Sequence, residues 1–236
     1  MKVAIIQARA GSSRLPGKVL KDLAGMPVLG HVIRRVAAIP GIDAVWCAVP
    51  DGASDDRVAE FAERTGARVS RGPEEDVLER YRIAAEASSA EVIMRVTSDC
   101  PLLDPGVSGK VLARLVDCGA DYVSNVNPRT WPRGLDTEAM TRHVFDRMAR
   151  EATEAYDREH VTPWLLKTAS ISRENVALSH KRYVGWRWTL DYEEDLAFMQ
   201  AVAARLPMPP HEASFNEIRA IVEANPEIAA INAAKE

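Results

Sequence analysis

The sequence predicts an α/β fold with three layers, in which a mostly parallel sheet is covered by helices on both faces. Short apolar runs typical of buried strands alternate with amphipathic stretches typical of helices from the first residues to Asn125, and this alternation favours a parallel sheet. The 236 residues, of which 47% are hydrophobic, can bury one sizeable core. No repeat or low-complexity linker divides the chain, so we expect a single domain over residues 1–236.

The first half of the chain is predicted element by element from composition and periodicity. Val3-Ala4-Ile5-Ile6 is an apolar run typical of a buried strand. The next strand ends at the turn signal Pro50-Asp51-Gly52, after which Ser54 is the expected N-cap of a helix. Together the patterns predict strands at 3–6, 44–49, 67–70, 92–96 and 121–124, with helices at 54–66 and 76–87.

The regular alternation ends after Asn125. Beyond it the sequence predicts a Pro- and Gly-rich loop over 127–134, a strand within 135–141, and helices from His143, over 195–205 and from Ser214. We expect residues 127–185 to form an inserted element for substrate binding or dimerisation.

The segment from Gln7 to Lys18 carries the densest chemistry in the chain. It follows the first strand, and its Gly and Ser residues allow a tight turn that exposes backbone N–H groups, as phosphate-binding loops do. Three cations, Arg9, Arg14 and Lys18, lie in the same loop. This combination predicts a triphosphate-binding loop. The alternative is an ordinary connection whose cations are solvated.

Two common phosphate-binding motifs do not account for this loop. A Walker A motif requires four residues between its glycines and a Ser or Thr after the Lys, whereas five residues separate Gly11 from Gly17 and Val19 follows Lys18. The dinucleotide pattern G-x-G-x-x-G is also absent, because Ser12 follows Gly11 directly.

Overall composition limits the partners. The net charge of −4 predicts no nucleic-acid partner, and no apolar run reaches the ~20 residues of a membrane span. Lys2 is followed at once by a short strand, so no signal peptide is expected. The three cysteines form no C-x-x-C pair, which suits reduced thiols in the cytoplasm.

Two carboxylates are candidate metal ligands. Triphosphate chemistry uses a divalent cation, and Mg²⁺ takes one or two carboxylates together with water and phosphate oxygens. Asp99 follows the strand at 92–96, where open α/β sheets bind ligands, and Asp191 ends an apolar segment before a helix. Asp99 could instead form a turn. Asp191 could be an N-cap whose capping box is closed by Glu194.

The loop also carries a family resemblance. Ala8-Arg9, Ser13 and the unbroken run Arg14-Leu15-Pro16-Gly17-Lys18 resemble the signature of the sugar-nucleotide pyrophosphorylase superfamily. Within it they resemble the cytidylyltransferases similar to CMP-Kdo synthetase, acylneuraminate cytidylyltransferase and spore-coat polysaccharide biosynthesis protein F. Gln7 and Ser98-Asp99-Cys100 depart from the Kdo type toward the spore-coat type. The resemblance implies a Rossmann-like fold of the nucleotide-diphospho-sugar transferase kind.

The resemblance further implies an activity and its residues. It implies a cytoplasmic, homodimeric, Mg²⁺-dependent enzyme that converts CTP and an acidic sugar, or a related acid, into the CMP-conjugate and pyrophosphate for surface-polysaccharide biosynthesis. Lys18 and Arg14 are the expected catalytic cations, and Asp99 and Asp191 the metal ligands. The expected nucleotide contacts are Gln7, Ala8, Arg9, Gly11, Ser12, Ser13, Arg71, Asp76 and Ser98, and the expected acceptor contacts are Arg133, Asp136, Glu138, Arg158 and His160.

Alternatives remain open at this point. A glycosyltransferase of the same general fold shows a D-x-D metal motif, whereas Ser98-Asp99-Cys100 supplies one Asp. A nucleotide-binding subunit without turnover is the non-enzymatic alternative. At the acceptor side, Arg133 and Arg158 could be solvated or paired with nearby acids, and His160 could be a packing residue.

Overall fold

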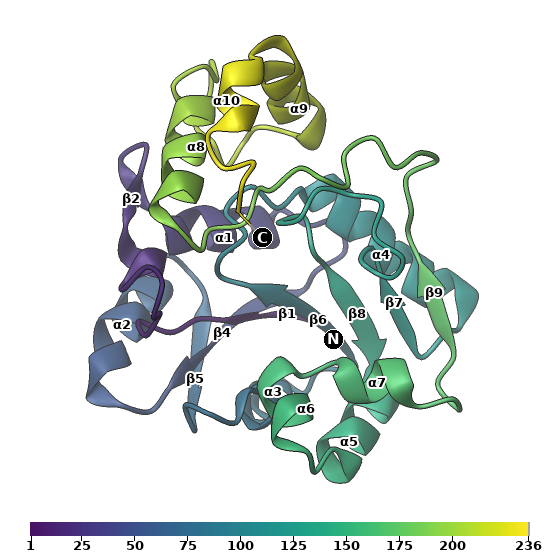
Figure 1. Cartoon of the computed structure of the whole chain (residues 1–236). Coiled ribbons are helices and arrows are strands. Elements are labelled where there is room, and N and C mark those ends of the chain that lie inside the picture. The colour runs from purple at the N-terminus through teal and green to yellow at the C-terminus, as the bar shows by residue number, and fades with distance from the viewer. Residues whose placement is uncertain (236) are drawn as a thin grey trace.

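The computed structural model describes residues 1–235 and centres on one seven-stranded sheet in the order β5-β4-β1-β6-β8-β7-β9 (Figure 1). Strands β1, β4, β5 and β6 are parallel, and β8 runs antiparallel to both β6 and β7. The predicted mostly parallel sheet is therefore confirmed. The strands are β1 (Lys2–Gln7), β4 (Ala44–Pro50), β5 (Arg68–Gly72), β6 (Val92–Thr97), β7 (Tyr122–Ser124), β8 (Glu138–Thr141) and β9 (Arg173–Asn175).

The register brings the carboxyl ends of the central strands to one edge. Gln7 at the end of β1 lies opposite Ala48 of β4 and Thr97 of β6. Chain segments that leave these strands therefore begin side by side, although they are far apart in the sequence. This edge is where ligands bind in open α/β sheets.

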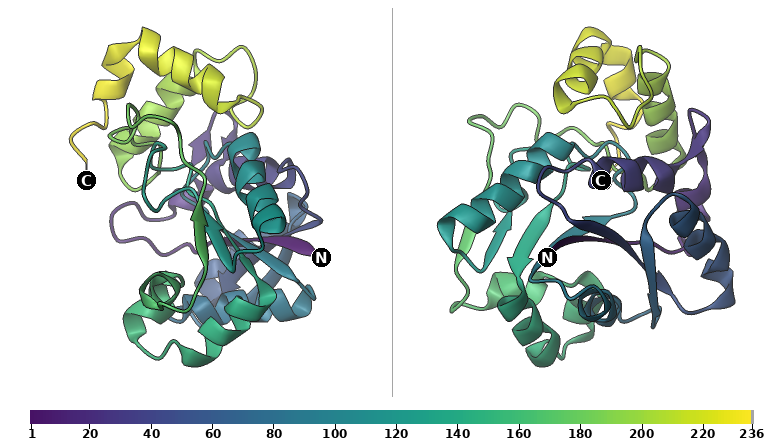
Figure 2. Two further views of the ribbon diagram at one scale, coloured as in Figure 1. Left: turned by 90° about the vertical axis from the view of Figure 1, so that its right-hand side faces the viewer. Right: turned by 180° about the vertical axis from the view of Figure 1, so that it is seen from behind.

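Helices cover both faces of the sheet (Figures 1 and 2). Ala4 and Ile6 of β1 point into one core, whereas Val3 and Ile5 point into the other, as the two-residue period of a strand requires. The first core is covered by α1 (Val28–Ala37), α2 (Asp56–Arg64) and α4 (Pro105–Cys118), and the second by α3 (Val77–Ala87), α5 (Arg142–Glu151), α6 (Ala155–His160) and α7 (Pro163–Lys167).

A third core lies above the carboxyl edge, at the top of Figure 1. It contains Trp188, 1% exposed, and it also buries Leu15 of the loop after β1. The elements around it are α8 (Glu193–Ala203), α9 (Phe215–Ala224), α10 (Pro226–Ala230) and the hairpin of β2 (Asp22–Leu23) and β3 (Met26–Pro27). Two short 3-10 helices complete the chain, η1 (Lys18–Leu20) and η2 (Ala53–Asp55).

Several predicted elements differ in their bounds. The predicted N-cap Ser54 is wrong, because η2 precedes α2 and Asp55 takes the N-cap position. The strand expected within 135–141 is confined to β8. The edge strand β9 was not predicted, because its residues Arg173-Glu174-Asn175 carry no apolar signal. Within residues 1–235, none of the helices is long and apolar enough to cross a bilayer.

Candidate active site

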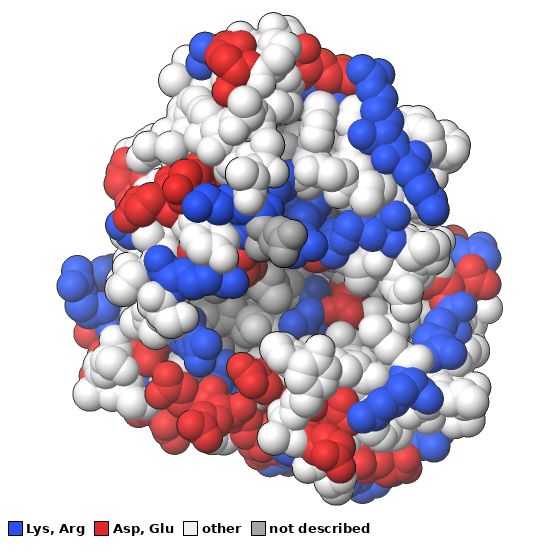
Figure 3. All heavy atoms as spheres, in the orientation of Figure 1, with Lys and Arg blue, Asp and Glu red and all other residues white. Residues whose placement is uncertain are grey.

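A cleft of about 790 Å³ opens at the carboxyl ends of β1 and β6. Side chains come from the loop after β1, from η1, the start of α3, β6 and α6, and from Asp191, so the cleft is assembled from segments far apart in the sequence. Figure 3 shows Lys and Arg side chains gathered around the hollow on this face, with Asp and Glu side chains below it. Its size suits a nucleotide-sized ligand together with a small second molecule.

Tertiary contacts shape the loop of residues 8–18. The buried carboxylate of Asp55 accepts a hydrogen bond from the Ala10 N–H at 2.6 Å, and the Gly17 N–H donates to the Ala10 carbonyl at 3.1 Å. Gly17 has φ of 67°, a conformation that favours glycine. Among residues 1–235, the backbone N–H groups of 11–14 have no hydrogen-bond acceptor. They are therefore free to bind an anion.

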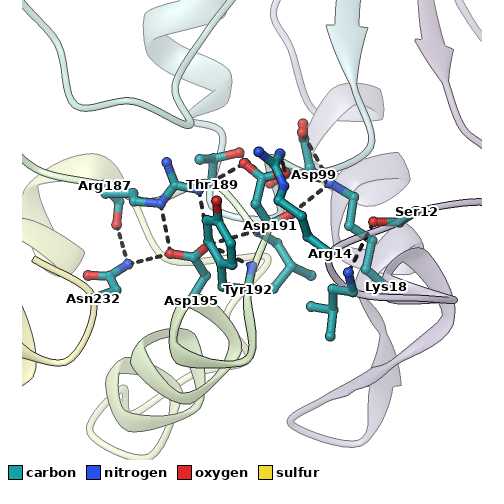
Figure 4. A network of polar contacts seen from close by, with 12 residues as sticks. Ser12, Arg14, Lys18, Asp99, Arg187, Thr189, Asp191, Tyr192, Asp195 and Asn232 are labelled. Carbon is teal, nitrogen blue, oxygen red and sulfur yellow. Dashed lines mark hydrogen bonds and ion pairs between the residues drawn. The ribbon is translucent and has the colours of Figure 1, made fainter. Parts of the chain in front are cut away.

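One cation connects three segments at the end of this loop (Figure 4). Lys18 Nζ donates to Asp191 Oδ1 at 2.9 Å and to Asp99 Oδ2 at 3.4 Å. It also donates to the Leu190 carbonyl at 2.7 Å. Three oxygen atoms thus converge on one positively charged atom, and two of them are the carboxylates that the sequence analysis selected as metal ligands.

Asp191 is paired with two further cations. Arg14 contacts its Oδ1 at 2.8 Å, and Arg187 donates to its Oδ2 at 2.8 Å. Burial alone raises the pKa of Asp191, but Lys18, Arg187 and Arg14 outweigh burial, so the pKa is lowered. Asp191 is consequently an ionised carboxylate at neutral pH. Its charge in turn raises the pKa of Arg14.

Hydrogen bonds fix both the side chain and the backbone carbonyl of Asp99. Thr97, the last residue of β6, donates its hydroxyl hydrogen bond to Asp99 Oδ1 at 2.5 Å. The Asp99 carbonyl accepts from the Leu190 N–H at 2.8 Å and from the Thr189 hydroxyl at 3.3 Å. These bonds join the end of β6 to the segment that carries Asp191, so the two carboxylates are held at one place.

The opposite end of the loop forms the wall above β1. The Ser98 N–H donates to the Gln7 carbonyl at 3.2 Å, and the Tyr81 hydroxyl lies 3.3 Å from Gln7 Oε1. Burial raises the pKa of Tyr81 far above its usual value, so the hydroxyl stays protonated and remains a donor. The same hydroxyl also donates to the Val96 carbonyl at 3.1 Å, so Tyr81 contacts both β1 and β6.

The structure brings most of the sequence-predicted residues together and leaves six outside. Their catalytic and metal-binding roles remain predictions, but the structure shows which of these residues line the cleft. The cleft is lined by Gln7, Ala8, Arg9, Gly11, Ser12, Ser13, Arg14, Lys18, Ser98, Asp99, His160 and Asp191. It is not lined by Arg71, Asp76, Arg133, Asp136, Glu138 or Arg158.

Two of these six residues are paired with each other. Arg158 donates to Asp76 at 2.7 Å, and Asp76 also caps α3 by accepting the Glu79 N–H at 2.9 Å. Asp76, predicted to contact the nucleotide, and Arg158, predicted to contact the acceptor, are thus paired with each other. Arg71 is bound by Asp56 at 2.6 Å, near the carboxyl end of the edge strand β5.

The remaining three belong to the region around β8. Asp136 forms a two-pronged pair with Arg129 at 2.6 and 2.7 Å. Glu138 is buried and binds Arg95 and the Tyr122 hydroxyl. The Arg133 side chain is exposed outside the cleft. Spacing in the sequence could not show these pairings, because each joins residues from different turns or strands.

The N-cap alternative for Asp191 is wrong. The N-cap of α8 is Tyr192, and the capping box is closed by Asp195, whose Oδ2 accepts the Tyr192 N–H at 3.0 Å. Glu194 points to the surface and pairs with Lys235 at 3.0 Å. The Asp191 side chain is directed at Lys18 instead.

Other residues that line the cleft were not predicted from the sequence. Arg95 and Thr97 line the cleft, and their two-residue spacing on a predicted strand could have placed them on the same face. Arg80 and Glu159 line it as well, but they come from α3 and α6, and nothing in their spacing indicated this. Arg187 and Asp195 lie behind Asp191, outside the cleft.

Comparison with known proteins shows the family of the chain. A family model described as cytidylyltransferase matches residues 3–222. The spore coat polysaccharide biosynthesis protein SpsF of Bacillus subtilis is 32% identical over 232 residues, which cover 95% of each chain. The chain belongs to the cytidylyltransferase family. It is accordingly a nucleotidyltransferase.

Solved structures of cytidylyltransferases share the fold. A cytidylyltransferase from Leptospira borgpetersenii superposes with a TM-score of 0.91 at 28% identity and covers 97% of both chains. A CMP-2-keto-3-deoxy-manno-octonic acid synthetase in complex with CTP superposes with a TM-score of 0.67, at 21% identity, over 87% of this chain and 99% of that one. The predicted Rossmann-like nucleotidyltransferase fold is confirmed.

Proposed function

We propose that this cytidylyltransferase transfers the cytidylyl group of CTP to an acidic sugar or a related acid, with a divalent cation, Mg²⁺, bound at Asp99 and Asp191. The observation that carries the proposal is the convergence of these two carboxylates on Lys18 at the end of a loop with free N–H groups. The spore-coat relative, by its name, supports a role in polysaccharide biosynthesis. We further propose that the enzyme is a cytoplasmic homodimer.

The chemistry of the carboxylate pair suits a divalent cation. Two ionised carboxylates brought to ~4 Å would repel by ~4 kcal/mol at an effective dielectric of ~20, and a cation between them offsets that repulsion. Lys18 Nζ stands at that place and has oxygen neighbours only, which is the donor set that Mg²⁺ prefers. Within residues 1–235 no group of three or more His, Cys, Asp or Glu residues could hold a metal, and two carboxylates leave room for phosphate oxygens and water.

The loop residues would hold the triphosphate. The free N–H groups of 11–14 can donate to phosphate oxygens, and Lys18 and Arg14 can offset the negative charge that develops on the departing pyrophosphate. When bound, the cation supplies Lewis-acid polarisation of the phosphate oxygens. The acceptor oxygen forms a bond to the α-phosphorus, and the bond to the β-phosphate oxygen breaks with its electron pair leaving on pyrophosphate.

The acceptor lies, on this proposal, at the α6 end of the cleft. Arg133 and Arg158, the cations first expected to bind an acid, are outside the cleft. Arg95 and His160 line it instead, although Arg95 is also paired with the buried Glu138. We therefore assign recognition of the acidic group to this end of the cleft.

Pyrophosphate release tests the proposal. The purified protein is incubated with CTP, UTP, GTP or ATP, with and without Mg²⁺, across a panel of acidic sugars, sugar phosphates and phosphonates. We expect release with CTP and one acceptor class, abolished without Mg²⁺ and reduced at least ~100-fold in Asp99→Asn. Release of a free nucleoside diphosphate from a nucleotide sugar would favour the glycosyltransferase. CTP binding without turnover of any acceptor would favour a regulatory subunit.

A further inference from the structure

Behind Asp191, on the side away from the cleft, lies a buried polar network (Figure 4). Asp195 in the first turn of α8 has no exposed surface. The Arg187 side chain is 5% exposed, and Asn232 in the C-terminal segment is 3% exposed. None of the three lines the cleft. They therefore do not reach a bound nucleotide directly.

Asp195 and Arg187 determine how Asp191 is presented. Asp195 Oδ2 accepts the Asp191 N–H at 2.8 Å, which fixes the backbone of Asp191. Arg187 Nη2 donates to Asp191 Oδ2 at 2.8 Å, which leaves Oδ1 directed at Lys18. Arg187 itself is held by Asp195, through Nε at 2.9 Å and Nη2 at 3.1 Å. Each of these bonds is charge-assisted and buried or part-buried, so each resists rotation of its partner.

Asn232 completes the network from a distant part of the sequence. Its Nδ2 donates to Asp195 Oδ1 at 2.9 Å and to the Arg187 carbonyl at 3.0 Å. The segment is anchored by Ile228 of α10, which is 1% exposed in the third core. Asn232 lies beyond the family match, which ends at residue 222.

Burying the charges of this network costs desolvation free energy. A buried ion pair must compensate for the hydration that its charges lose, and it does so only when the remaining hydrogen-bond capacity is used. Asp195 accepts five hydrogen bonds, from Asp191, Tyr192, Asn232 and two nitrogens of Arg187. Apolar residues could fill the same space at a lower desolvation cost, but they could not orient a carboxylate.

We propose that Asp195, Arg187 and Asn232 are positioning residues, which hold the Asp191 carboxylate toward Asp99 for cation binding, and that the C-terminal segment supports the active site through Asn232 from outside the cleft. The proposal rests on the proposed function, in which Asp191 is a metal ligand. Outer residues of this kind change metal affinity by about 10- to 100-fold when they are removed.

The test measures metal affinity rather than activity alone. Mn²⁺ binding to the 236-residue protein, with CTP present, is followed by the loss of the free Mn²⁺ resonance in electron paramagnetic resonance, relative to the same CTP solution without protein. We expect Asn232→Ala and Asp195→Asn to weaken Mn²⁺ binding by about tenfold or more. Half-maximal pyrophosphate release should need a correspondingly higher metal concentration, while the rate at saturating metal changes far less.

Asn225→Ala is the matched control. Asn225 also donates to a backbone carbonyl, that of Ile221 at 2.7 Å, but it does not contact the network. This variant should bind Mn²⁺ like the wild type. Circular dichroism melting identifies variants that fail to fold, and Asn232→Ala keeps the Arg187–Asp195 pair, so it tests the proposal even if Asp195→Asn unfolds.

Two outcomes contradict the proposal and differ from each other. If the wild type binds Mn²⁺ and folded Asn232→Ala and Asp195→Asn bind it equally well, the network does not position Asp191. If the wild type with CTP binds no Mn²⁺, the result contradicts the metal site of the proposed function and, with it, the positioning proposal.

Discussion

Lys18 holds two carboxylates that lie 81 and 173 residues away from it in the sequence. Both contacts and the bond to the Leu190 carbonyl place its ammonium group where a bound cation is expected. Lys18 and a divalent cation therefore compete for the same oxygens. In the presence of CTP, the phosphates offer the lysine a second anionic partner, so binding of nucleotide and metal should be cooperative.

This competition gives a prediction for Lys18→Met, which keeps the side-chain length but removes the charge. Without nucleotide, the variant should bind Mn²⁺ about tenfold more tightly than the wild type, because no charge-assisted hydrogen bond has to break. Its pyrophosphate release should fall at least ~100-fold, since a cation that stabilises the leaving group is lost.

Lys21→Met is the control for that measurement. Lys21 pairs with Glu193 at 2.9 Å, near the same helix end but outside the cleft. It should leave both Mn²⁺ affinity and rate close to those of the wild type. Weaker Mn²⁺ binding by Lys18→Met would contradict the competition and indicate that Lys18 is needed to hold the carboxylates in place.

Among the elements, α1 buries an ionisable group that is remote from the cleft. His31 is 1% exposed, and its Nε2 donates to the Leu23 carbonyl at 2.7 Å. Burial, with the nearby His211 and Arg35, lowers the pKa of His31 to about 4 although the Leu23 bond opposes the change. The ring is therefore neutral in the folded protein at neutral pH and links α1 to the β2–β3 hairpin.

The pKa of His31 predicts how stability depends on pH. His31 binds a proton near pH 6.5 in the unfolded chain but only near pH 4 in the folded protein. The contribution of the neutral ring to the free energy of unfolding is therefore intact above pH 6.5. It is lost, by roughly 3 kcal/mol, as the pH falls toward 4. His31→Gln should remove that part of the dependence in urea unfolding. His143→Gln, at an exposed site, should leave it unchanged, and an equal slope in all three proteins would contradict the assignment.

Elements were predictable to the extent that their own residues carry a signal. The parallel strands β1, β4 and β6 show apolar runs that are mostly buried, and Asp104 with Pro105 marks the start of α4, where Asp104 accepts the Val107 N–H at 2.7 Å. The two residues of β2 and the polar β9 show no such pattern, because their pairing partners define them.

At the scale of the whole molecule, the site is assembled from segments that local patterns cannot connect. The sequence allowed the loop of 7–18 and the two carboxylates to be predicted, because each follows the end of a strand or an apolar run. It could not show that Arg158 is paired with Asp76, since that contact spans 82 residues. Nor could it show that Asn232 reaches Asp195, because the three C-terminal helices must first pack into their own core.

The central claim is that the cleft binds CTP together with a divalent cation at Asp99 and Asp191. Equilibrium dialysis of labelled CTP, with and without Mg²⁺, tests it without knowledge of the acceptor, and UTP, GTP and ATP serve as competitors. The predicted result is Mg²⁺-dependent binding that is selective for CTP and weakened at least about tenfold in Asp191→Asn. Binding that is indifferent to Mg²⁺, to the base and to this substitution would contradict the account.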